Sequence, residues 1–401
     1  MKICIINYFA GNRDSGWGER HFFIGKELLK KGCKLLIISS ASNHMFDQAI
    51  ESKKTFTFEN YEGVDFCWVK VPKYSPTSVM RFWSMWVFTM RLFLFPFKRA
   101  GVPEYIIVSS MPMFPVLPAL YFKRKFKVKK LAFEVRDLWP LTPVYLGNVS
   151  KYNPMVILMK IIERIAYKRS DIILSLLPRA DKYINPITGY PNKFVYLPNG
   201  ISEQVNTNEE LPFASMNIIP ANKFVVGYAG SLGIANAMEY VVDAARILRN
   251  NTNIHFVILG EGYQKKYLVE KAKDISNVTF LPKVKKGVVS KVISKFDTCI
   301  ISWNKSDLYQ FGVSANKLFD YMLASKPIVI AGNLADNPVE LSKSGICVEP
   351  ESGDAIAKAI LDMFNLSKEM REKYGRNGRS FLEKNHTYAV LAQRLVASLN
   401  G

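Results

Sequence analysis

The stretch "SANKLFDYMLASKPIVI", residues 314–330, reads as an amphipathic helix that leads directly into a buried strand. Apolar residues recur at helical spacing as far as Leu323, and the β-branched run 328–330 follows a proline. A helix that delivers the chain to a short apolar strand is the repeating unit of parallel α/β proteins. The stretch therefore predicts an α/β fold.

The front of this helix carries an unusual charge. If Ser314 is the N-cap, the next three residues form the first turn, where backbone amides have no partner within the helix. The helix dipole favours an acid there, yet the sequence places Lys317, at a cost of about a few tenths of a kcal/mol. An anionic ligand would reverse that sign, because each charge-assisted hydrogen bond contributes about 1.5–3 kcal/mol. We therefore expect an anion-binding site formed by Ser314, Ala315, Asn316 and Lys317. Asp320, one helical turn later, would lie within reach of neutral hydroxyls of the ligand beside the anionic group.

Composition limits the class of protein. The chain has 401 residues, of which 49% are hydrophobic, which is enough for a large core in two or three domains. The net charge of +20 predicts attraction to nucleic acid, anionic lipid or phosphorylated substrates. The sequence has no RNA-recognition, zinc-finger or helix-turn-helix signature, so we expect no nucleic-acid partner. Five scattered cysteines without metal or redox spacing fit a reducing cytosol, and the apolar start "MKICIINYF" is too short for a signal sequence.

Short apolar runs alternate with helical segments and fall into two series. The first comprises residues 1–9, 34–39, 105–110, 130–137, 171–177 and 193–200. The second comprises residues 223–231, 254–262, 278–284, 297–303, 326–332 and 345–350. This alternation predicts two doubly wound parallel sheets, each covered by helices on both faces, with binding at the carboxyl ends of the strands.

The domain boundary is expected in the polar, proline-containing segment 203–223. The first domain would then comprise residues 1–204 and the second residues 205–379. The last segment reads as helical, and Gly375 and Gly378 are expected to bend it before its final turns.

Two candidate sites follow strands of the first series. Gly16 and Gly18 lie just before an amphipathic helix, where bare backbone can approach a ligand or simply make a strand-to-helix turn. The full dinucleotide-binding glycine spacing is missing, which disfavours a dehydrogenase. Arg136 and Asp137 end an apolar strand, where they either pair with each other or face solvent in a cleft.

Two further candidates follow strands of the second series. Gly230 and Ser231 lie at another strand-to-helix junction. Glu261, between two glycines, either hydrogen-bonds the hydroxyls of a nucleotide or caps the following helix.

The segment "VMRFWSMWVFTMRLFLFPFKR", residues 79–99, is apolar almost all round and rich in Trp and Phe. Its basic residues Arg81, Arg91, Lys98 and Arg99 and its proline argue against a membrane span. Two interpretations remain open: a helix that lies in the lipid headgroup zone, which the overall charge favours, or a core helix of the first domain.

Five motifs occur in the order typical of one enzyme family: "FEVRDLWP", "LPNGI", "VVGYAGSLG", "ILGEGYQKKYL" and "FGVSANKLFDYMLASKPIV". With them, nearly the whole chain resembles the retaining, nucleotide-sugar-dependent glycosyltransferases of family four, which have the GT-B fold. The last motif is the most specific. The likeness is closest to the branch that transfers N-acetylated amino sugars, such as N-acetylfucosamine, in O-antigen and capsule assembly.

The resemblance implies two Rossmann-like domains that face each other across a cleft. The final helix, residues 380–401, would return to the first, acceptor-binding domain. The nucleotide-sugar donor would lie mainly against the second domain.

Residue by residue, the resemblance implies that Glu261 lies near the nucleoside and Asp320 near the ribose. The diphosphate would meet Ser314, Asn316 and Lys317. Gly18 would approach the phosphates from the first domain, and Asp137 would lie near the transferred sugar. Gly16, Arg136, Gly230, Ser231 and Ala315 complete the expected donor-binding set.

Several positions depart from the pattern of the wider family. Of its two glutamates, separated by seven residues, the second is Asp320 here and the first is Gly312. The loop after "YAG" often carries an arginine and a lysine, whereas this chain has "SLGIANAM". Arg136 stands where histidine is frequent. Lys317 and main-chain amides would therefore bind more of the phosphate charge.

These features predict transfer of a sugar from a nucleotide diphosphate, most simply UDP, to a lipid-linked saccharide on the cytoplasmic face of the plasma membrane. Lys317 and Asp137 would be the catalytic residues, and no metal or other cofactor is expected. Two alternatives remain: a UDP-N-acetylglucosamine 2-epimerase and a non-catalytic protein that binds sugar nucleotides or anionic lipid.

Overall fold

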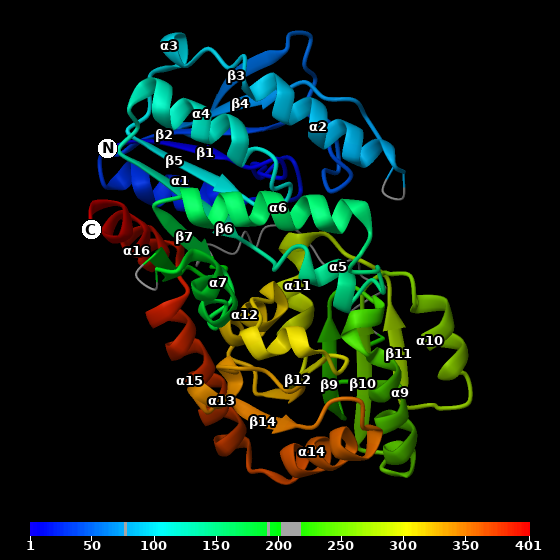
Figure 1. Ribbon diagram of the computed structural model, residues 1–401. Coiled ribbons are helices and arrows are strands. Elements are labelled where there is room, and N and C mark those ends of the chain that lie inside the picture. Colours follow the sequence, from blue (N-terminus) through cyan, green and yellow to red (C-terminus); the bar gives the residue numbers. More distant parts are fainter. Residues whose placement is uncertain (76–77, 191–192, 202–217) are drawn as a thin grey trace. The chain divides into compact units, whose positions relative to one another are not determined.

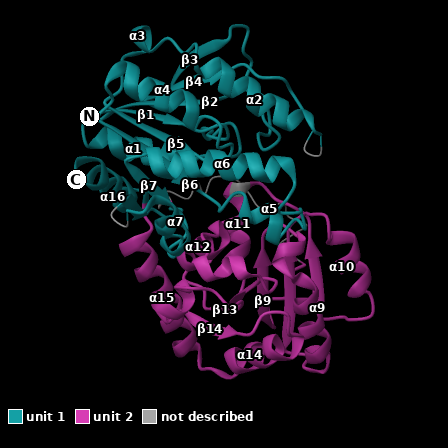
Figure 2. Cartoon of the chain, in the orientation of Figure 1, with its two compact units in different colours: residues 1–200, 388–401 teal, residues 201–387 magenta. Residues whose placement is uncertain are grey.

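The computed structural model describes residues 1–75, 78–190, 193–201 and 218–401 (Figure 1). The chain divides into two compact units (Figure 2). Unit 1 comprises residues 1–200 and 388–401, and unit 2 comprises residues 201–387. The boundary expected at residues 204–205 lies outside the described residues. The chain returns to unit 1 at Tyr388, where the sequence had suggested residue 380.

Unit 1 contains an eight-stranded sheet in the order β3-β4-β2-β1-β5-β6-β7-β8. The strands are β1 (Lys2–Ile6), β2 (Lys34–Ser40), β3 (Phe56–Tyr61), β4 (Val64–Val69), β5 (Tyr105–Ser109), β6 (Lys130–Val135), β7 (Ile172–Ser175) and β8 (Phe194–Tyr196). All neighbours are parallel except β3 and β4, which form an antiparallel hairpin at one edge. The central strands are apolar because helices cover both of their faces.

The helices of unit 1 are α1 (Arg20–Lys30), α2 (Met80–Leu92), α3 (Phe97–Ala100), α4 (Val116–Phe126), α5 (Leu141–Tyr145), α6 (Pro154–Arg169), α7 (Asp181–Thr188) and α16 (Tyr388–Asn400). Helix α16 packs against α1, and the rings of Phe23 and Tyr388 stack with their centroids 5.1 Å apart. In the described part of the chain, no helix is long and apolar enough to cross a membrane.

Unit 2 contains a six-stranded, wholly parallel sheet in the order β11-β10-β9-β12-β13-β14. Its strands are β9 (Phe224–Ala229), β10 (Ile254–Leu259), β11 (Val278–Leu281), β12 (Thr298–Ser302), β13 (Ile328–Ala331) and β14 (Gly345–Val348). Its helices are α9 (Met238–Ile247), α10 (Lys265–Lys271), α11 (Lys286–Ile293), α12 (Asn316–Leu323), α13 (Pro338–Ser342), α14 (Gly353–Asn365) and α15 (Lys368–Asn385). Short 3₁₀ turns are η2 (Ile234–Asn236), η3 (Leu248–Asn250) and η4 (Asp307–Phe311).

The bend expected at Gly375 and Gly378 is absent, because α15 runs unbroken past both residues. The two glycines are buried. A Cβ at position 375 would lie 1.9 Å from the carbonyl oxygen of Ser325, and one at position 378 would lie 3.0 Å from Cβ of Ser344. They therefore allow α15 to approach its neighbours closely.

Candidate functional site: the front of helix α12

One edge of unit 2 brings together the ends of β9 and β10 and the start of α12. The carboxyl ends of neighbouring parallel strands meet at the same edge of a sheet, so the loops after β9 and β10 are adjacent. The amide of Gly230 donates to the carbonyl of Leu259 (3.0 Å), and the amide of Leu232 donates to that of Glu261 (2.9 Å). Three of the expected positions, Gly230, Ser231 and Glu261, thus lie on two joined loops.

Helix α12 is held against the end of β9 by Tyr321. The amide of Ala229 donates to the Tyr321 hydroxyl (2.7 Å), which in turn donates to the carbonyl of the same residue (3.2 Å). Tyr321 is completely buried. Its two bonds fix the helix relative to the strand that precedes Gly230.

The expected cap of α12 was wrong. The helix begins at Asn316, and its N-cap is Ala315, which has an extended backbone and no capping side chain. The carbonyl of Ala315 accepts a hydrogen bond from the amide of Leu318 (3.1 Å). Ser314 therefore lies one position before the cap, and the amide-rich first turn starts one residue later than expected. The amides of Asn316 and Lys317 lie at the positive end of the helix dipole.

Lys317 directs its ammonium group toward the loop after β9. Its Nζ donates to the hydroxyl of Tyr228 (2.9 Å) and to Oδ1 of Asn236, and it lies 4.7 Å from the centroid of the Tyr228 ring. Both partners are neutral, so burial lowers the pKa of Lys317 to about 7. In the part of the chain that the structure describes, no acid forms an ion pair with Lys317.

The partners of Lys317 are themselves oriented. The Tyr228 hydroxyl donates to the carbonyl of Ser231 (2.7 Å), and Nδ2 of Asn236 donates to the same carbonyl (3.0 Å). A Cβ at Gly230 would lie 3.0 Å from the Tyr228 hydroxyl and 3.4 Å from Cε of Lys317, so a larger residue would crowd the lysine. Tyr228 and Asn236 were not among the residues expected from the sequence. The only available signal for Asn236 was its place in the loop that often carries basic residues.

The two acids expected near the nucleoside differ in their surroundings. Glu261 is exposed and forms an ion pair with Lys265 in the first turn of α10, which lowers the pKa of the carboxyl. The N-cap of α10 is Gln264, so Glu261 does not occupy the capping position. Asp320 is half-buried on α12, one turn after its start. Gly312, which replaces the first glutamate of the family pattern, is buried at the end of η4.

In unit 1, the end of β6 carries Arg136 and Asp137. The amide of Arg136 donates to the hydroxyl of Ser110 (3.1 Å), and burial lowers the pKa of its half-buried guanidinium. Asp137 is exposed. Because β1, β5 and β6 are neighbouring parallel strands, the glycine loop after β1 emerges at the same sheet edge as Asp137.

A buried ionic cluster beneath that edge was not foreseen. Glu134 of β6 accepts hydrogen bonds from Nη2 of Arg20 (3.0 Å) and from the hydroxyl of Ser109 (2.6 Å), and its Oε2 lies 2.9 Å from Nε2 of His21. Burial alone would raise the pKa of Glu134, but His21 and Arg20 outweigh it and hold that pKa well below its usual range. Arg20 also donates to the carbonyls of Leu197 and Pro198. The cluster therefore joins the start of α1, β5, β6 and the segment after β8.

The described residues contain no group of three or more His, Cys, Asp or Glu side chains arranged to hold a metal ion.

Solved structures share this architecture. Sucrose-phosphate synthase from Thermosynechococcus elongatus superposes with a TM-score of 0.74 at 14% identity, covering 99% of this chain and 97% of that chain. Anabaena HepE in complex with UDP and glucose gives a TM-score of 0.65 at 12% identity, covering 100% and 99%. The protein therefore has the GT-B fold, built from two Rossmann-like units.

Residues 223–365 match the family model described as Glycosyl transferases group 1. This range lies in unit 2 and contains Tyr228, Asn236 and Lys317. The chain is also similar to WcaI of Escherichia coli strain K12, which is named as a glycosyl transferase of colanic acid biosynthesis. The two are 22% identical over 389 residues, covering 92% of this chain and 93% of WcaI.

Proposed function

We propose that the protein is a retaining glycosyltransferase that moves an N-acetylated amino sugar from a UDP-sugar to a lipid-linked saccharide in cell-surface polysaccharide assembly. The observation that carries the proposal is Lys317, a half-buried lysine at the front of α12 whose hydrogen-bond partners among the described residues, Tyr228 and Asn236, are both neutral. A diphosphate would supply the missing negative charge. The family match of unit 2 and the similarity to WcaI support this class of donor and pathway.

Lys317 would lower the reaction barrier by stabilising the departing diphosphate. Negative charge develops on the phosphate oxygens as the bond to the sugar breaks, and donors fixed in advance stabilise it without reorganising. The ammonium group uses two of its protons on Tyr228 and Asn236, which leaves the third for a phosphate oxygen. The first-turn amides of Asn316 and Lys317 would also stabilise the negative charge of the diphosphate, with Ser314 beside them.

The remaining roles follow the expected placement of the donor. Glu261 would exchange Lys265 for nucleoside hydroxyls, and Asp320 would meet the ribose. Unit 1 would supply Gly18 near the phosphates and Asp137 near the transferred sugar. With Gly312 in place of a glutamate, contacts to the sugar would rely more on Asp137.

The stereochemical route would be departure and attack on the same face of the sugar. A double-displacement route needs a carboxylate close to the reacting carbon. No residue of the expected site has been assigned that role, since Glu261 and Asp320 are given to the nucleoside and Asp137 to positioning. The leaving phosphate would accept the proton of the attacking hydroxyl.

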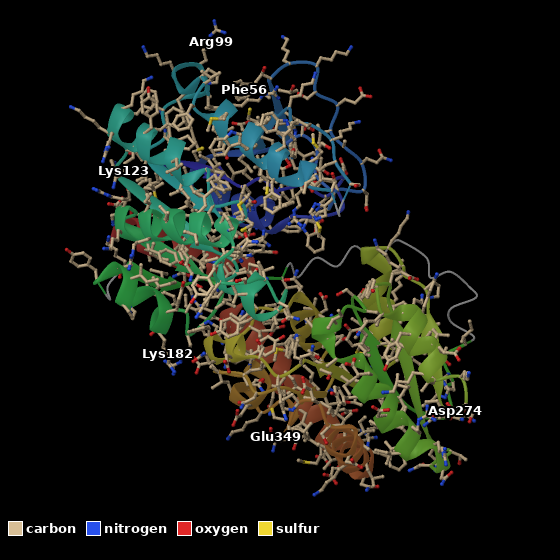
Figure 3. All side chains as sticks on the ribbon, turned by 45° about the vertical axis from the view of Figure 1, so that its right-hand side comes forward. Phe56, Arg99, Lys123, Lys182, Asp274 and Glu349 are labelled. Atoms are coloured by element: carbon tan, nitrogen blue, oxygen red, sulfur yellow. The ribbon has the colours of Figure 1, made fainter. Side chains whose placement is uncertain are left out.

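The acceptor would be a lipid-linked saccharide at the cytoplasmic membrane face, reached through the surface of α2. Exposed fractions of 42% for Phe82, 53% for Trp83 and 41% for Trp86 contrast with the buried Met85 and Phe88 on the opposite side. Arg99 on α3 projects away from the fold (Figure 3). Aromatic side chains beside cations are typical of helices that lie in the headgroup zone.

Vesicle sedimentation tests the membrane proposal. Charge reversal of Arg81, Lys98 and Arg99 should release the protein from anionic vesicles, and high salt should do the same. Arg91 serves as a poorer probe, because its guanidinium already donates to the carbonyl of Lys70. Vesicle binding that is unchanged both by the charge reversals and by high salt would refute the proposal.

A panel of nucleotide sugars, incubated with lipid-linked acceptors and read by mass spectrometry, tests the enzymatic proposal. Transfer from a UDP-N-acetylamino sugar to a lipid-linked saccharide, with retained anomeric configuration, is expected. Conversion of the donor without any acceptor would instead indicate an epimerase. Calorimetric UDP binding without transfer to any lipid extract would indicate a non-catalytic binding protein.

A further inference from the structure

Helix α6 of unit 1 carries two neighbouring stripes of side chains. The isoleucine stripe consists of Ile157, Ile161 and Ile165. The basic stripe consists of Lys160, Arg164 and Lys168. Residues at every fourth position lie on one side of a helix, so each series forms a continuous row, and the two rows lie next to each other. All three cations are exposed, as are Ile157 and Ile161.

A groove of about 550 Å³ runs between α6 and α7, which lie side by side in unit 1 (Figure 1). Both stripes of α6 line it, together with Tyr183 and Ile187 of α7. The Tyr183 hydroxyl donates to Oε2 of Glu163 on α6 (2.9 Å), which ties the two helices together. The volume of the groove lies within the range of about 300–1,000 Å³ that is usual for sites of small molecules.

The basic stripe has little counter-charge within the protein. Glu163 is the only acid of α6 and is buried. Burial raises the pKa of Glu163 to about 7, so near neutral pH the carboxyl carries only part of a negative charge. In the described ranges, no acid forms an ion pair with a residue of the basic stripe. The groove therefore combines an apolar wall with unneutralised cations.

The neighbouring helices share this lack of acids. Helices α2, α3 and α4 contain no Asp or Glu, and α2 contacts α4. The crossovers through α4 and α6 step in the same direction across the sheet, which puts both helices on one face of it. In unit 2, α14 and α15 carry acids as well as cations. The excess of positive charge is thus concentrated on this face of unit 1.

An exposed aromatic ring lies near the carboxyl end of α6. Tyr190 follows α7 and is 64% exposed, and Nζ of Lys193 lies 5.2 Å from its ring centroid. The same ammonium group donates to the carbonyl of Lys168 (3.1 Å), the last residue of the basic stripe. An aromatic ring beside cations is typical of the lipid headgroup zone.

We propose that the α6–α7 groove binds a single anionic phospholipid of the bilayer, with the phosphate at the basic stripe and an acyl chain along the isoleucine stripe. Such a lipid complements both stripes, and clusters of cations on amphipathic helices bind anionic lipids. A second copy of the chain, paired by twofold symmetry, would bring the same cations together and is disfavoured. The proposal rests on the peripheral membrane location of the proposed function and adds a second lipid contact to that of α2.

The first experiment measures binding of a single lipid by calorimetry. The probe is dihexanoyl-phosphatidylglycerol below its micelle concentration, with dihexanoyl-phosphatidylcholine as the control for charge. Substituting Arg164→Gln and Lys168→Gln together should weaken phosphatidylglycerol binding about 30-fold, equivalent to about 2 kcal/mol, because each cation beside an anionic lipid contributes about 1 kcal/mol. The pair Lys31→Gln and Lys34→Gln removes two exposed lysines elsewhere in unit 1 and should bind as the wild type does.

The second experiment tests the acyl chain. Substituting Ile157→Ser and Ile161→Ser together should weaken phosphatidylglycerol binding about tenfold, the equivalent of nearly two buried CH₂ groups. Ile247→Ser, at an exposed position of unit 2, is the control. Both α6 pairs should also reduce sedimentation with vesicles of equal parts phosphatidylglycerol and phosphatidylcholine. The Tm of each variant should match that of the wild type, because the substituted side chains are exposed.

Four results would overturn the assignment. The first is equal binding of the two lipids, and the second is binding that neither α6 pair weakens. The third is binding of inorganic phosphate or polyglutamate as tight as that of phosphatidylglycerol, which would indicate an anion site without a lipid. The fourth is a dimer that the isoleucine substitutions dissociate, which would assign the groove to a second copy. None of these measurements needs sugar transfer, so a failure here leaves the proposed enzymatic activity to its own assay.

Discussion

Replacing Lys317 by methionine removes the charge at the front of α12 while keeping most of the side-chain volume. In the free protein two of its protons are held by Tyr228 and Asn236, so the bound diphosphate would receive one charge-assisted hydrogen bond. Such a bond contributes about 1.5–3 kcal/mol, and two unit charges 4 Å apart interact by about 4 kcal/mol at an effective dielectric constant of 20. We therefore expect kcat/KM for the UDP-sugar to fall about 10²- to 10³-fold, as for the loss of one oxyanion donor.

The assay is initial-rate UDP release with a saturating acceptor, together with calorimetric UDP binding. Lys295→Met, at an exposed position of unit 2, is the control and should retain wild-type kinetics. Because the amine is buried beside neutral partners, Lys317→Met should not lower Tm. Full activity in a folded Lys317→Met protein would refute the proposal that Lys317 binds the diphosphate.

The pKa of Lys317 adds a dependence on pH. The folded-state pKa of Lys317 is about 7, which is below the ordinary lysine value. Above pH 7 the folded protein therefore loses this proton, whereas the unfolded chain keeps it. Stability from this group therefore increases with pH between about 7 and about 10. Diphosphate binding reverses the depression, so UDP binding at pH 8 should take up a proton that the Lys317→Met protein does not. Calorimetry in buffers of different ionisation enthalpy measures that difference, and equal uptake in both proteins would contradict the prediction.

Three further predictions follow from named contacts. In Asn236→Asp the new carboxylate should pair with Lys317, and its Coulomb repulsion of the nearby diphosphate should weaken UDP binding about 10- to 100-fold. Asn236→Ala should weaken UDP binding less. Equal effects of the two substitutions would contradict the electrostatic account. Glu134→Gln should lower the free energy of unfolding by about 3–5 kcal/mol, because Arg20 would remain buried without a counter-ion. The contribution of Glu134 should disappear as pH falls through its lowered pKa, which urea unfolding at several pH values measures, and a pH-independent difference would argue against it. Gly375→Ala should cost about 1–3 kcal/mol through overlap with the Ser325 carbonyl, with the exposed Lys373→Ala as control; an unchanged Tm would show that α15 can shift freely.

Much of the fold could be predicted from the sequence, because apolar strands and amphipathic helices are recognised from local patterns of residues. The two series of buried strands are confirmed in both sheets. The β3–β4 hairpin was not among the expected strands. Strand β3 is polar and largely exposed, whereas β4 is apolar and buried and was missed although its pattern resembles that of the other strands. The turn at Glu62 and Gly63, both with positive φ, was the available local signal. The bend expected at Gly375 failed because a glycine can serve close packing as well as a change of direction.

The candidate site was predictable where a residue opposed a local rule. Lys317 stood out because the helix dipole disfavours a cation there, and Ser314 was misassigned as the cap because the extended Ala315 takes that place. Tyr228 and Asn236 lie 89 and 81 residues before Lys317 in sequence, so only the folded chain reveals their contacts. The Glu134 cluster likewise joins residues more than 100 positions apart.

The most direct measurement is a crystal structure of the protein with UDP bound. The account predicts that a phosphate oxygen lies within hydrogen-bonding distance of Nζ of Lys317 and of a first-turn amide of α12. A diphosphate bound elsewhere, with the ammonium group of Lys317 still occupied only by Tyr228 and Asn236, would contradict it.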